Sequence, residues 1–519
     1  MNEYFYNLNQ QTGELREGIL TDVSQENNTL TLELSDQYTW HNGDDVTADD
    51  LYTQLNIAKF FGGIRRTASL PSAVQGIEKN GEYKVDLQLS EPINIELFLI
   101  QSFIPGGAGT AFMWMPDAVF GEFSDRIDEA GSDQEEAIKQ DVLEFTWAPE
   151  DAYGCGPFEL TDSGATRFSY ELYEDYPGSA NINWTGASVE KVSGSDIIPA
   201  VRSNNVDFAN STISRSDAES LPENWDYTQS SVYGGPALLV NHDHDLLSQI
   251  EVKHALAHVI DNESLARNAG DFGTNAPPST YAGYVKENSQ QILGPPIEGN
   301  LISYDSEEEA TSLLQSVGFS KEDGEWYKPN GDRWSMSITT FNAPTWNSPT
   351  RGVASQFRQF GIDAEPNIVE GGQFFGEYPS GGYDVAVEFS GQSFNPNPFF
   401  AYPRNFTGFG GGSMNFPTTV EAPAFGERGG ELQTYDIPKM INRGFAASNQ
   451  DELVTQMRRL AWVHNYTLPT IPLTVMVRTN MYNTDDWEYP PEGEAFSWNG
   501  SHGIVAAMMR QGTLQAKTE

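Results

Sequence analysis

The chain has 519 residues, with 74 Asp and Glu against 29 Lys and Arg, so its formal net charge is −45 and its isoelectric point is near 4.3. Hydrophobic residues make up 38% of it, which is enough for a large core and excludes a disordered acidic protein. The sequence has no basic run that would release counterions from phosphate, so we expect no nucleic-acid partner.

The first predicted elements are a strand, a turn and a capped helix in close succession. Thr31–Leu34 alternates polar and apolar residues as a half-buried strand does. Asn42-Gly43 is a turn pair that follows it. Thr47 stands where it caps a helix, and Asp50 at the third helical position is placed to accept a hydrogen bond in return.

Further elements are predicted along the rest of the chain. A strand is expected near Tyr83–Leu89 and an acidic helix near Gln134–Glu144. Amphipathic helices are expected over Ile250–Ala266 and Asp451–His464, because apolar residues recur there at helical spacing. These residues are Val252, Leu256, Val259 and Ile260 in the first helix, and Leu453, Met457, Leu460 and Ala461 in the second.

Motifs for catalysis, metal binding and phosphate binding are weak. The Gly-rich segment Gly408–Ser413 lacks a strand before it and a helix after it, so it does not predict a phosphate loop. Cys155 is the only cysteine, and no Gly-x-Ser-x-Gly elbow occurs. The most metal-like group is His242, His244, His254 and His258. It lacks the Glu of a zinc-protease motif, so we interpret these as packed or solvated imidazoles and expect no metal, cofactor or catalytic site.

The segment Tyr38–Asp50, with Trp40-His41-Asn42-Gly43 followed by Val46-Thr47-Ala48, resembles the signature of the extracellular solute-binding proteins of family 5, the receptors of peptide and nickel ABC importers. Other segments are similar to family elements in the same order. They are Gly154–Phe158, Pro199–Ala209, Asn241 with Ile250–Asp261, Glu309–Phe319 and Gln359–Ala364. One such match is weak evidence for the family. An ordered set of matches that covers roughly residues 4 to 490 is strong evidence for it.

The resemblance implies an α/β fold of the large periplasmic-binding-protein type, with two lobes, a hinge between them and an extra subdomain. We expect residues 1–152 to form the accessory subdomain of the first lobe. Residues 153–238 and 470–519 would form the first lobe itself, and residues 239–469 the second. Family members carry an export signal, often a lipid-attachment Cys, and a first strand before the matched region. We therefore expect an N-terminally truncated chain and an extracellular, cell-surface location.

The resemblance also implies a receptor and not an enzyme. Such a receptor captures a peptide or other small organic solute between its lobes and delivers it to a membrane permease of an ABC importer. We expect it to act as a monomer. A ligand sensor and, more distantly, a hydrolase are the alternatives in other functional classes.

The chain departs from the family pattern at two positions that affect which ligand it can bind. Peptide-binding relatives hold the ligand amine with an Asp in a loop similar to Phe389–Pro398, where this chain has Gln392 and no acid. Dipeptide-binding relatives hold the carboxylate with an Arg in the segment that resembles Phe341–Trp346, which contains none. Burying an unpaired charged terminus costs several kcal/mol, which disfavours a short zwitterionic peptide.

A neutral or polar ligand, such as an oligosaccharide, is therefore a competitive alternative, and a metal complex is another. We expect stacking on Trp346 and Phe389 and hydrogen bonds to the amides of Gln392 and Asn395. The resemblance adds Gly156 and Asn241 to the predicted ligand-binding residues. With 29 Phe, 11 Trp and 22 Tyr in the chain, most aromatic residues must serve the core or ordinary surface.

The acidic residues are spread along the whole chain instead of forming one tail, as in Gln134–Glu136 and Glu307–Glu309. Dispersed carboxylates keep a surface hydrated and mutually repelling when the screening length falls to about 3 Å at molar salt. This pattern is typical of a halophilic protein, and we expect a haloarchaeal one. An ordinary acidic extracytoplasmic protein is the alternative.

Overall fold

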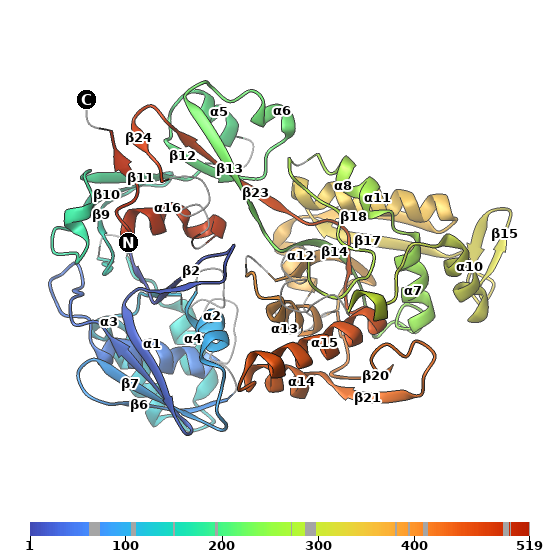
Figure 1. Cartoon of the computed structure of the whole chain (residues 1–519), viewed down its shortest axis with the longest axis horizontal. Helices are drawn as coiled ribbons and strands as arrows, with labels where there is room; N and C mark the ends of the chain where they lie inside the picture. The colour runs from blue at the N-terminus through green and yellow to red at the C-terminus, as the bar shows by residue number, and fades with distance from the viewer. Residues whose placement is uncertain are drawn as a thin grey trace. The chain divides into compact units, whose positions relative to one another are not determined.

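The computed structural model divides into two compact units (Figure 1). Unit 1 comprises residues 1–211, 221–230 and 480–519, and unit 2 comprises residues 212–220 and 231–479. The residues that the structure describes are 1–61, 73–104, 111–148, 151–192, 196–270, 272–285, 297–378, 381–392, 395–407, 414–490, 498 and 500–517. The Gly-rich segment Gly408–Ser413 lies outside them.

Unit 1 begins with an antiparallel sheet of four strands in the order β4-β5-β7-β6. Strand β5 alternates buried Leu with half-buried polar residues, as predicted from Thr31–Leu34. The elements in this part are β1 (Glu3–Tyr4), β2 (Tyr6–Leu8), β3 (Leu15–Glu17), β4 (Leu20–Glu26), β5 (Thr29–Leu34), α1 (Ala48–Phe61), β6 (Val74–Lys79), β7 (Lys84–Leu89), α2 (Ile95–Phe103), β8 (Phe112–Met113), α3 (Asp117–Glu129) and α4 (Glu135–Glu144).

The predicted turn and cap before α1 are confirmed with one difference. Gly43 has a φ of +91°, and its N–H donates to Trp40 O at 2.8 Å. The Thr47 N–H donates to Asp50 Oδ2 at 2.8 Å, as expected of a capping box. Thr47 Oγ1 accepts from Asp49 N at 3.3 Å, so it caps the second helical N–H instead of the third.

The C-terminal helix α16 contributes to a second core of unit 1. Ile504 and Met508 of this helix share a core cluster with Phe158 of β9. A second sheet has the order β11-β10-β9. The elements here are β9 (Phe158–Ser163), β10 (Arg167–Leu172), a 3-10 turn (Ser179–Asn181), β11 (Gly186–Glu190), α5 (Ile197–Arg202), β12 (Phe208–Ser211), β24 (Trp487–Glu488), α16 (Gly500–Arg510) and β25 (Gln515–Ala516).

Unit 2 is organised around a mixed sheet in the order β18-β17-β19-β14-β22. Strand β17 pairs in parallel with β18 and β19, and β14 is antiparallel to β19 and β22. Leu238 and Val387 face a large core cluster that includes residues of α7, α10 and α11, whereas Leu239 and Ala386 face a cluster that includes Phe374 of α12. The sheet is therefore covered by helices on both faces.

The strands of this sheet are β14 (Gly234–Val240), β17 (Ser335–Phe341), β18 (Asp363–Val369), β19 (Val385–Gly391) and β22 (Ile471–Pro472). The smaller hairpins are β15 (Ser320–Glu322) with β16 (Glu325–Tyr327) and β20 (Thr419–Pro423) with β21 (Leu432–Asp436). The helices are α6 (Arg215–Ala218), α7 (Ile250–Val259), α8 (Asn262–Asn268), α10 (Glu307–Ser316), α11 (Pro344–Phe360), α12 (Gly371–Glu377), α13 (Ala401–Thr407), α14 (Ile437–Phe445) and α15 (Gln450–Thr467), with 3-10 turns at Glu298–Asn300 and Pro398–Phe400.

The prediction of one helix over Ile250–Ala266 is wrong. Helix α7 ends at Val259, and α8 begins at Asn262 after two non-helical residues. Asp261 causes the break because its side chain accepts from Ser264 N at 3.0 Å and thereby caps a new helix. The helix predicted over Asp451–His464 is confirmed as part of α15, with Leu453 and Met457 buried as expected.

Strands β13 (Trp225–Ser231) and β23 (Val477–Asn483) carry the chain between the two units, because the unit boundaries fall within them. They belong to a three-stranded sheet of order β12-β23-β13. The predicted limits of the accessory subdomain and of the first lobe stay a proposal. In the part of the chain that the structure describes, we found no helix with the length and apolarity needed to cross a membrane.

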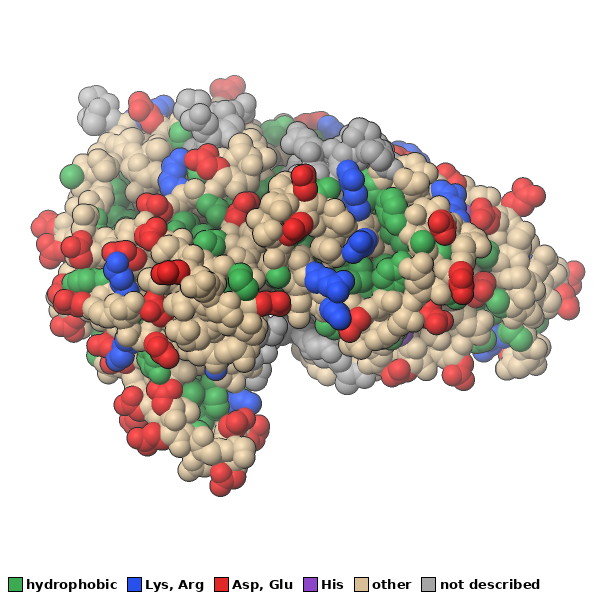
Figure 2. All heavy atoms as spheres, turned by 60° about the horizontal axis from the view of Figure 1, so that its bottom comes forward, with side chains coloured by type: hydrophobic (Ala, Val, Ile, Leu, Met, Phe, Trp, Pro, Cys, Tyr) green, Lys and Arg blue, Asp and Glu red, His purple; other side chains and the backbone are tan. Residues whose placement is uncertain are grey.

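Acidic side chains are scattered over the face shown in Figure 2 and are not gathered into one patch. The ion pairs of the described residues are mostly exposed, such as Lys79 with Asp49 at 2.5 Å and Lys84 with Glu33 at 2.9 Å. Exposed pairs of this kind contribute about 0–1 kcal/mol each.

Candidate ligand-binding site

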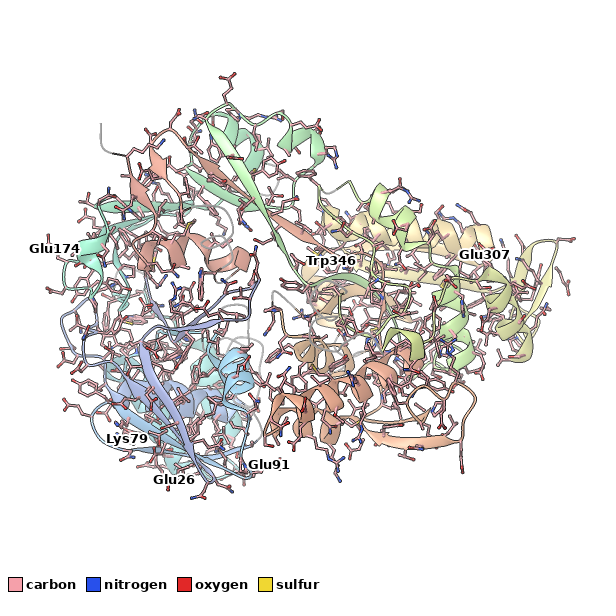
Figure 3. The ribbon with its side chains drawn as sticks, viewed as in Figure 1. Glu26, Lys79, Glu91, Glu174, Glu307 and Trp346 are labelled. Atoms are coloured by element: carbon pink, nitrogen blue, oxygen red, sulfur yellow. The ribbon has the colours of Figure 1, made fainter. Side chains whose placement is uncertain are left out.

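Two of the predicted ligand-binding residues, Trp346 and Phe389, lie together in unit 2. Both pack against the buried pair Val232 and Met476, and we call these four residues the aromatic patch. Trp346 is in the first turn of α11, which starts at Pro344, and its ring lies 5.1 Å from that of Phe341. Figure 3 labels Trp346 in this part of unit 2. Both aromatic side chains are only partly buried, so they keep surface for a ligand.

The aromatic patch contains contacts that no sequence pattern indicates. The Val232 N–H donates to Met476 O at 3.1 Å, although the two residues are far apart in the chain. The guanidinium of Arg404, on α13, lies 4.4 Å from the centre of the Phe389 ring, a cation–π contact. Neighbours that are far apart in the chain leave no local sequence pattern, so the sequence did not indicate Val232, Met476 or Arg404 as part of this site.

The side chains of Gln392 and Asn395 are occupied by contacts to the backbone. Gln392 is 3% exposed, and its Oε1 accepts from Val285 N at 3.2 Å. Its Nε2 donates to Asn395 O at 3.0 Å and to Pro396 O at 3.2 Å. Asn395 Oδ1 accepts from Asn397 N at 2.9 Å. In the structure, Gln392 braces the loop after β19, and direct contact of either amide with a ligand stays a prediction.

Asn241 lies away from the aromatic patch. It follows the end of β14 that pairs with Val385, whereas Phe389 and Gly391 pair with the start of β14. Asn241 and Gln392 lie one residue beyond opposite ends of the seven paired positions, so at about 3.4 Å per residue they are about 27 Å apart. Its side-chain amide donates to Gly381 O at 2.9 Å. Its predicted ligand contact is therefore not part of the same cluster.

Gly156 belongs to unit 1 and has a packing role there. Its N–H donates to Met1 O at 2.9 Å, and its carbonyl bonds His41 Nε2 at 2.8 Å. A Cβ at this position would lie 2.9 Å from the backbone oxygens of Met1 and Asn2, so only glycine fits. Its ligand contact stays a prediction.

A close approach of two glycines fixes the position of the loop that carries Gln392. Gly234 and Gly391 pair at the start of β14, and a Cβ on Gly391 would lie 2.5 Å from Gly234 Cα. Tyr233, just before this pair, has a φ of +51°, which is costly for a bulky residue. Its carbonyl accepts from Gln392 N at 2.7 Å. Strained backbone of this kind is common at ligand sites.

A buried polar network also holds strand β19, through the side chain of Ser390. Ser390 Oγ donates to Asn405 Oδ1 at 3.1 Å and lies 2.8 Å from Thr470 Oγ1. Asn405 Nδ2 donates to Gly283 O at 2.9 Å and lies 3.3 Å from His464 Nε2. Burial lowers the pKa of His464 to about 4, so the imidazole is neutral near pH 7.

Of the four histidines singled out from the sequence, His242 packs edge-on against Phe416 with the ring centres 4.7 Å apart, and its buried Nε2 has no hydrogen-bond partner among the described residues. The other three have separate partners. His244 Nδ1 accepts from Leu246 N at 3.2 Å, and His254 Nε2 bonds Tyr466 O at 2.6 Å. His258 Nδ1 accepts from Ser306 N at 3.2 Å. Among the described residues, no three His, Cys, Asp or Glu side chains form a group that could hold a metal ion. Cys155 is buried, and burial raises the pKa of its thiol to about 12, so it is a poor nucleophile at pH 7.

Comparison with family models decides the class of the protein. The model described as bacterial extracellular solute-binding proteins, family 5 Middle, matches residues 14–412. The chain belongs to this family. The sequence resemblance stated above is therefore confirmed, and so is the two-lobed α/β fold class. A search of curated proteins gave no match for this family 5 protein.

Solved structures share the fold of this family 5 protein at low sequence identity. A mannohexaose-bound periplasmic oligopeptide-binding protein from Thermotoga maritima has a TM-score of 0.72 at 16% identity, over 100% of this chain and 93% of that one. The oligopeptide-binding protein AppA from Bacillus subtilis, with a nonapeptide, has a TM-score of 0.69 at 13% identity and covers 100% and 93%. NikZ from Campylobacter jejuni, with Ni(L-His), has 0.69 at 17% identity and covers 94% and 89%.

Proposed function

We propose that this family 5 protein is the extracellular substrate-binding receptor of an ABC importer. We also propose that its cargo is a neutral, polar organic solute, with an oligosaccharide as the leading class. The receptor role follows from the family. The location outside the cell and the membrane permease as partner also follow from the family. The single observation that carries the cargo class is the aromatic patch of Trp346, Phe389, Val232 and Met476.

Aromatic faces suit a sugar because the C–H faces of the ring pack on them, whereas polar groups at the edge fix its orientation. Trp346 and Phe389 are partly buried on a common apolar base, so each is held in place but keeps exposed area. The energy lost by ordering these side chains on binding is therefore small.

A zwitterionic peptide finds less support at the same place. The Gln392 amide, which stands where relatives have an acid, is 3% exposed and bonded at both ends to backbone groups. A sugar as cargo is supported by the mannohexaose-bound structure of the same fold.

The proposal is tested by isothermal titration with two probes, mannohexaose and a trialanine peptide. We expect saturable binding of the oligosaccharide with a stoichiometry of one, and binding at least tenfold weaker for the peptide. Trp346→Ala and Phe389→Ala should each weaken oligosaccharide binding by about tenfold, which corresponds to about 1.4 kcal/mol for one lost stacking face.

Phe425→Ala is the matched control because Phe425 is also partly exposed, at 38%, but belongs to the loop between β20 and β21. It should bind the oligosaccharide as tightly as the unchanged protein. Tight peptide binding, or equal losses in the Phe389 and Phe425 variants, would overturn the proposed cargo. The receptor role would then stand with a different solute.

A further inference from the structure

Lys253 of helix α7 is a buried cation without a counter-charge. Its side chain belongs to a residue that is 4% exposed, and none of the ion pairs of the described residues includes it. An ammonium group has three N–H donors, and the described residues offer Nζ one hydrogen-bond acceptor, Thr467 O at the end of α15. Buried charges in proteins are normally paired, because an unpaired one is costly. Lys253 therefore lacks an anion.

His242 gives a second and independent sign of a missing group. Its Nε2 is buried and has no hydrogen-bond partner among the described residues. Burial, and next the charge of Lys253, lower the pKa of His242 well below its usual range, so the ring is neutral and carries one proton. With this proton on Nε2, the ring presents an N–H donor. Buried donors nearly always have an acceptor, so this atom indicates an acceptor that does not belong to the described chain.

The ring of Phe416 brings the two groups together in unit 2. The His242 ring stands edge-on to it, with the ring centres 4.7 Å apart, and Lys253 Nζ lies 5.8 Å from its centre. The segment that carries Phe416 is held over His242, because the His242 N–H donates to Met414 O at 2.9 Å. Two buried nitrogens that lack acceptors, one of them cationic, therefore lie around a single apolar ring.

We propose that His242 Nε2 and Lys253 Nζ bind one chloride ion beside the ring of Phe416. Chloride fits both groups, because it is a monatomic, monovalent acceptor that takes N–H donors from several directions. It neutralises the ammonium group and completes the hydrogen bonding of the imidazole. A water molecule would satisfy His242 alone, because it leaves the charge of Lys253 unpaired. The bound ion would join the segment after β14, helix α7 and the segment before β20 (Figure 1).

A specific site can be told apart from general attraction of anions in this chain. The net charge of −45 repels chloride from the surface as a whole. Saturable binding of one chloride per chain therefore requires a local arrangement of donors. The result does not depend on which cargo the aromatic patch binds.

Chlorine-35 NMR tests the site, because chloride that exchanges with a protein site gives a broadened line. The full chain is titrated in sodium chloride, with sodium gluconate keeping the ionic strength constant. We expect broadening that corresponds to one site per chain and that bromide removes by competition. Lys253→Met should abolish the broadening. His242→Phe keeps a ring against Phe416 but lacks the donor, so it should weaken chloride binding about tenfold, as expected for one hydrogen bond to a charged group.

Lys321→Met is the matched control. Lys321 also lies over aromatic rings, 4.7 Å from the centre of Phe360 and 5.4 Å from that of Trp326, but it is exposed. This variant should bind chloride as the unchanged protein does, and far-UV circular dichroism verifies that each variant folds. If Lys253→Met fails to fold, His242→Phe decides. No broadening by the unchanged protein, full broadening by Lys253→Met or His242→Phe, or an equal loss in Lys321→Met would overturn the proposal.

Discussion

Arg510 donates from Nε to both carboxylate oxygens of Glu3, at 3.0 and 3.1 Å, across 507 positions of sequence. The side chains are 6% and 2% exposed, and Tyr176 OH also donates to Glu3 Oε2 at 3.0 Å. Strand β1 and helix α16, near the two ends of the chain, are therefore joined by a buried ion pair inside unit 1. Its charges are shielded from water and little screened by salt.

Replacing Glu3 with Gln should destabilise unit 1 strongly. The substitution keeps the volume but leaves the Arg510 guanidinium buried without a counter-charge, which costs about 3–5 kcal/mol in the free energy of unfolding. Urea denaturation followed by circular dichroism measures this. Glu33→Gln is the control, because its pair with Lys84 is substantially exposed and should cost less than about 1 kcal/mol. Similar losses in both variants would contradict the expectation.

Stability should fall between pH 6.5 and pH 4 in a way that depends on His464. Burial lowers the pKa of this imidazole to about 4, against 6.5 in the unfolded chain, so unfolding takes up a proton in this range. The folded state then loses up to about 3 kcal/mol as the pH falls through the window. His464→Gln should show a shallower decline than the unchanged protein in urea midpoints at pH 7, 5.5 and 4.5. Parallel declines would contradict this role.

Lys253 should give a pH dependence of the same sign at alkaline pH. It is 4% exposed, its Nζ donates to Thr467 O at the end of α15, and burial lowers its pKa to about 7. Above pH 7 the unfolded chain keeps the proton that the folded chain has lost, so stability rises with pH up to about 10. We expect a rise of about 1 kcal/mol per pH unit between pH 7.5 and 9.5. Lys253→Met should abolish the rise in stability. A rise of the same slope in the variant would contradict the assignment of this pH dependence to Lys253.

Salt should stabilise the protein as a whole. At 0.1 M salt the screening length is about 10 Å, so each carboxylate repels several neighbouring carboxylates. At 1 M salt the screening length falls to about 3 Å, and this repulsion is largely removed. With a net charge of −45, we expect the thermal midpoint to rise by several degrees between 0.1 and 2 M KCl. Sucrose at equal osmolality controls for exclusion effects. An equal rise in sucrose would show that charge screening is not the cause.

Local features of the fold could be predicted, because neighbouring residues determine them. The alternation in Thr31–Leu34, the Asn42-Gly43 turn and the bond from Thr47 N to Asp50 are all set within a few residues. The break between α7 and α8 was missed because apolar periodicity continues through Ile260, whereas the cap formed by Asp261 ends the helix.

The candidate site could be predicted only in part. Trp346 and Phe389 were identified by resemblance, but Val232 and Met476, which hold them together, come from distant segments. The bonds of Gln392 to Val285, Asn395 and Pro396 depend on tertiary packing, so no sequence pattern shows whether its amide faces a ligand.

The contact between Gly234 and Gly391 limits how the binding specificity of this protein can be redesigned. A Cβ on Gly234 would clash with Ser390 O and lie 2.6 Å from the Phe389 ring, and one on Gly391 would lie 2.5 Å from Tyr233 O. Any side chain at either position would push apart the strands that hold Phe389 and Gln392. A mutant library aimed at new cargo should therefore vary Trp346 and Phe389 and keep both glycines unchanged.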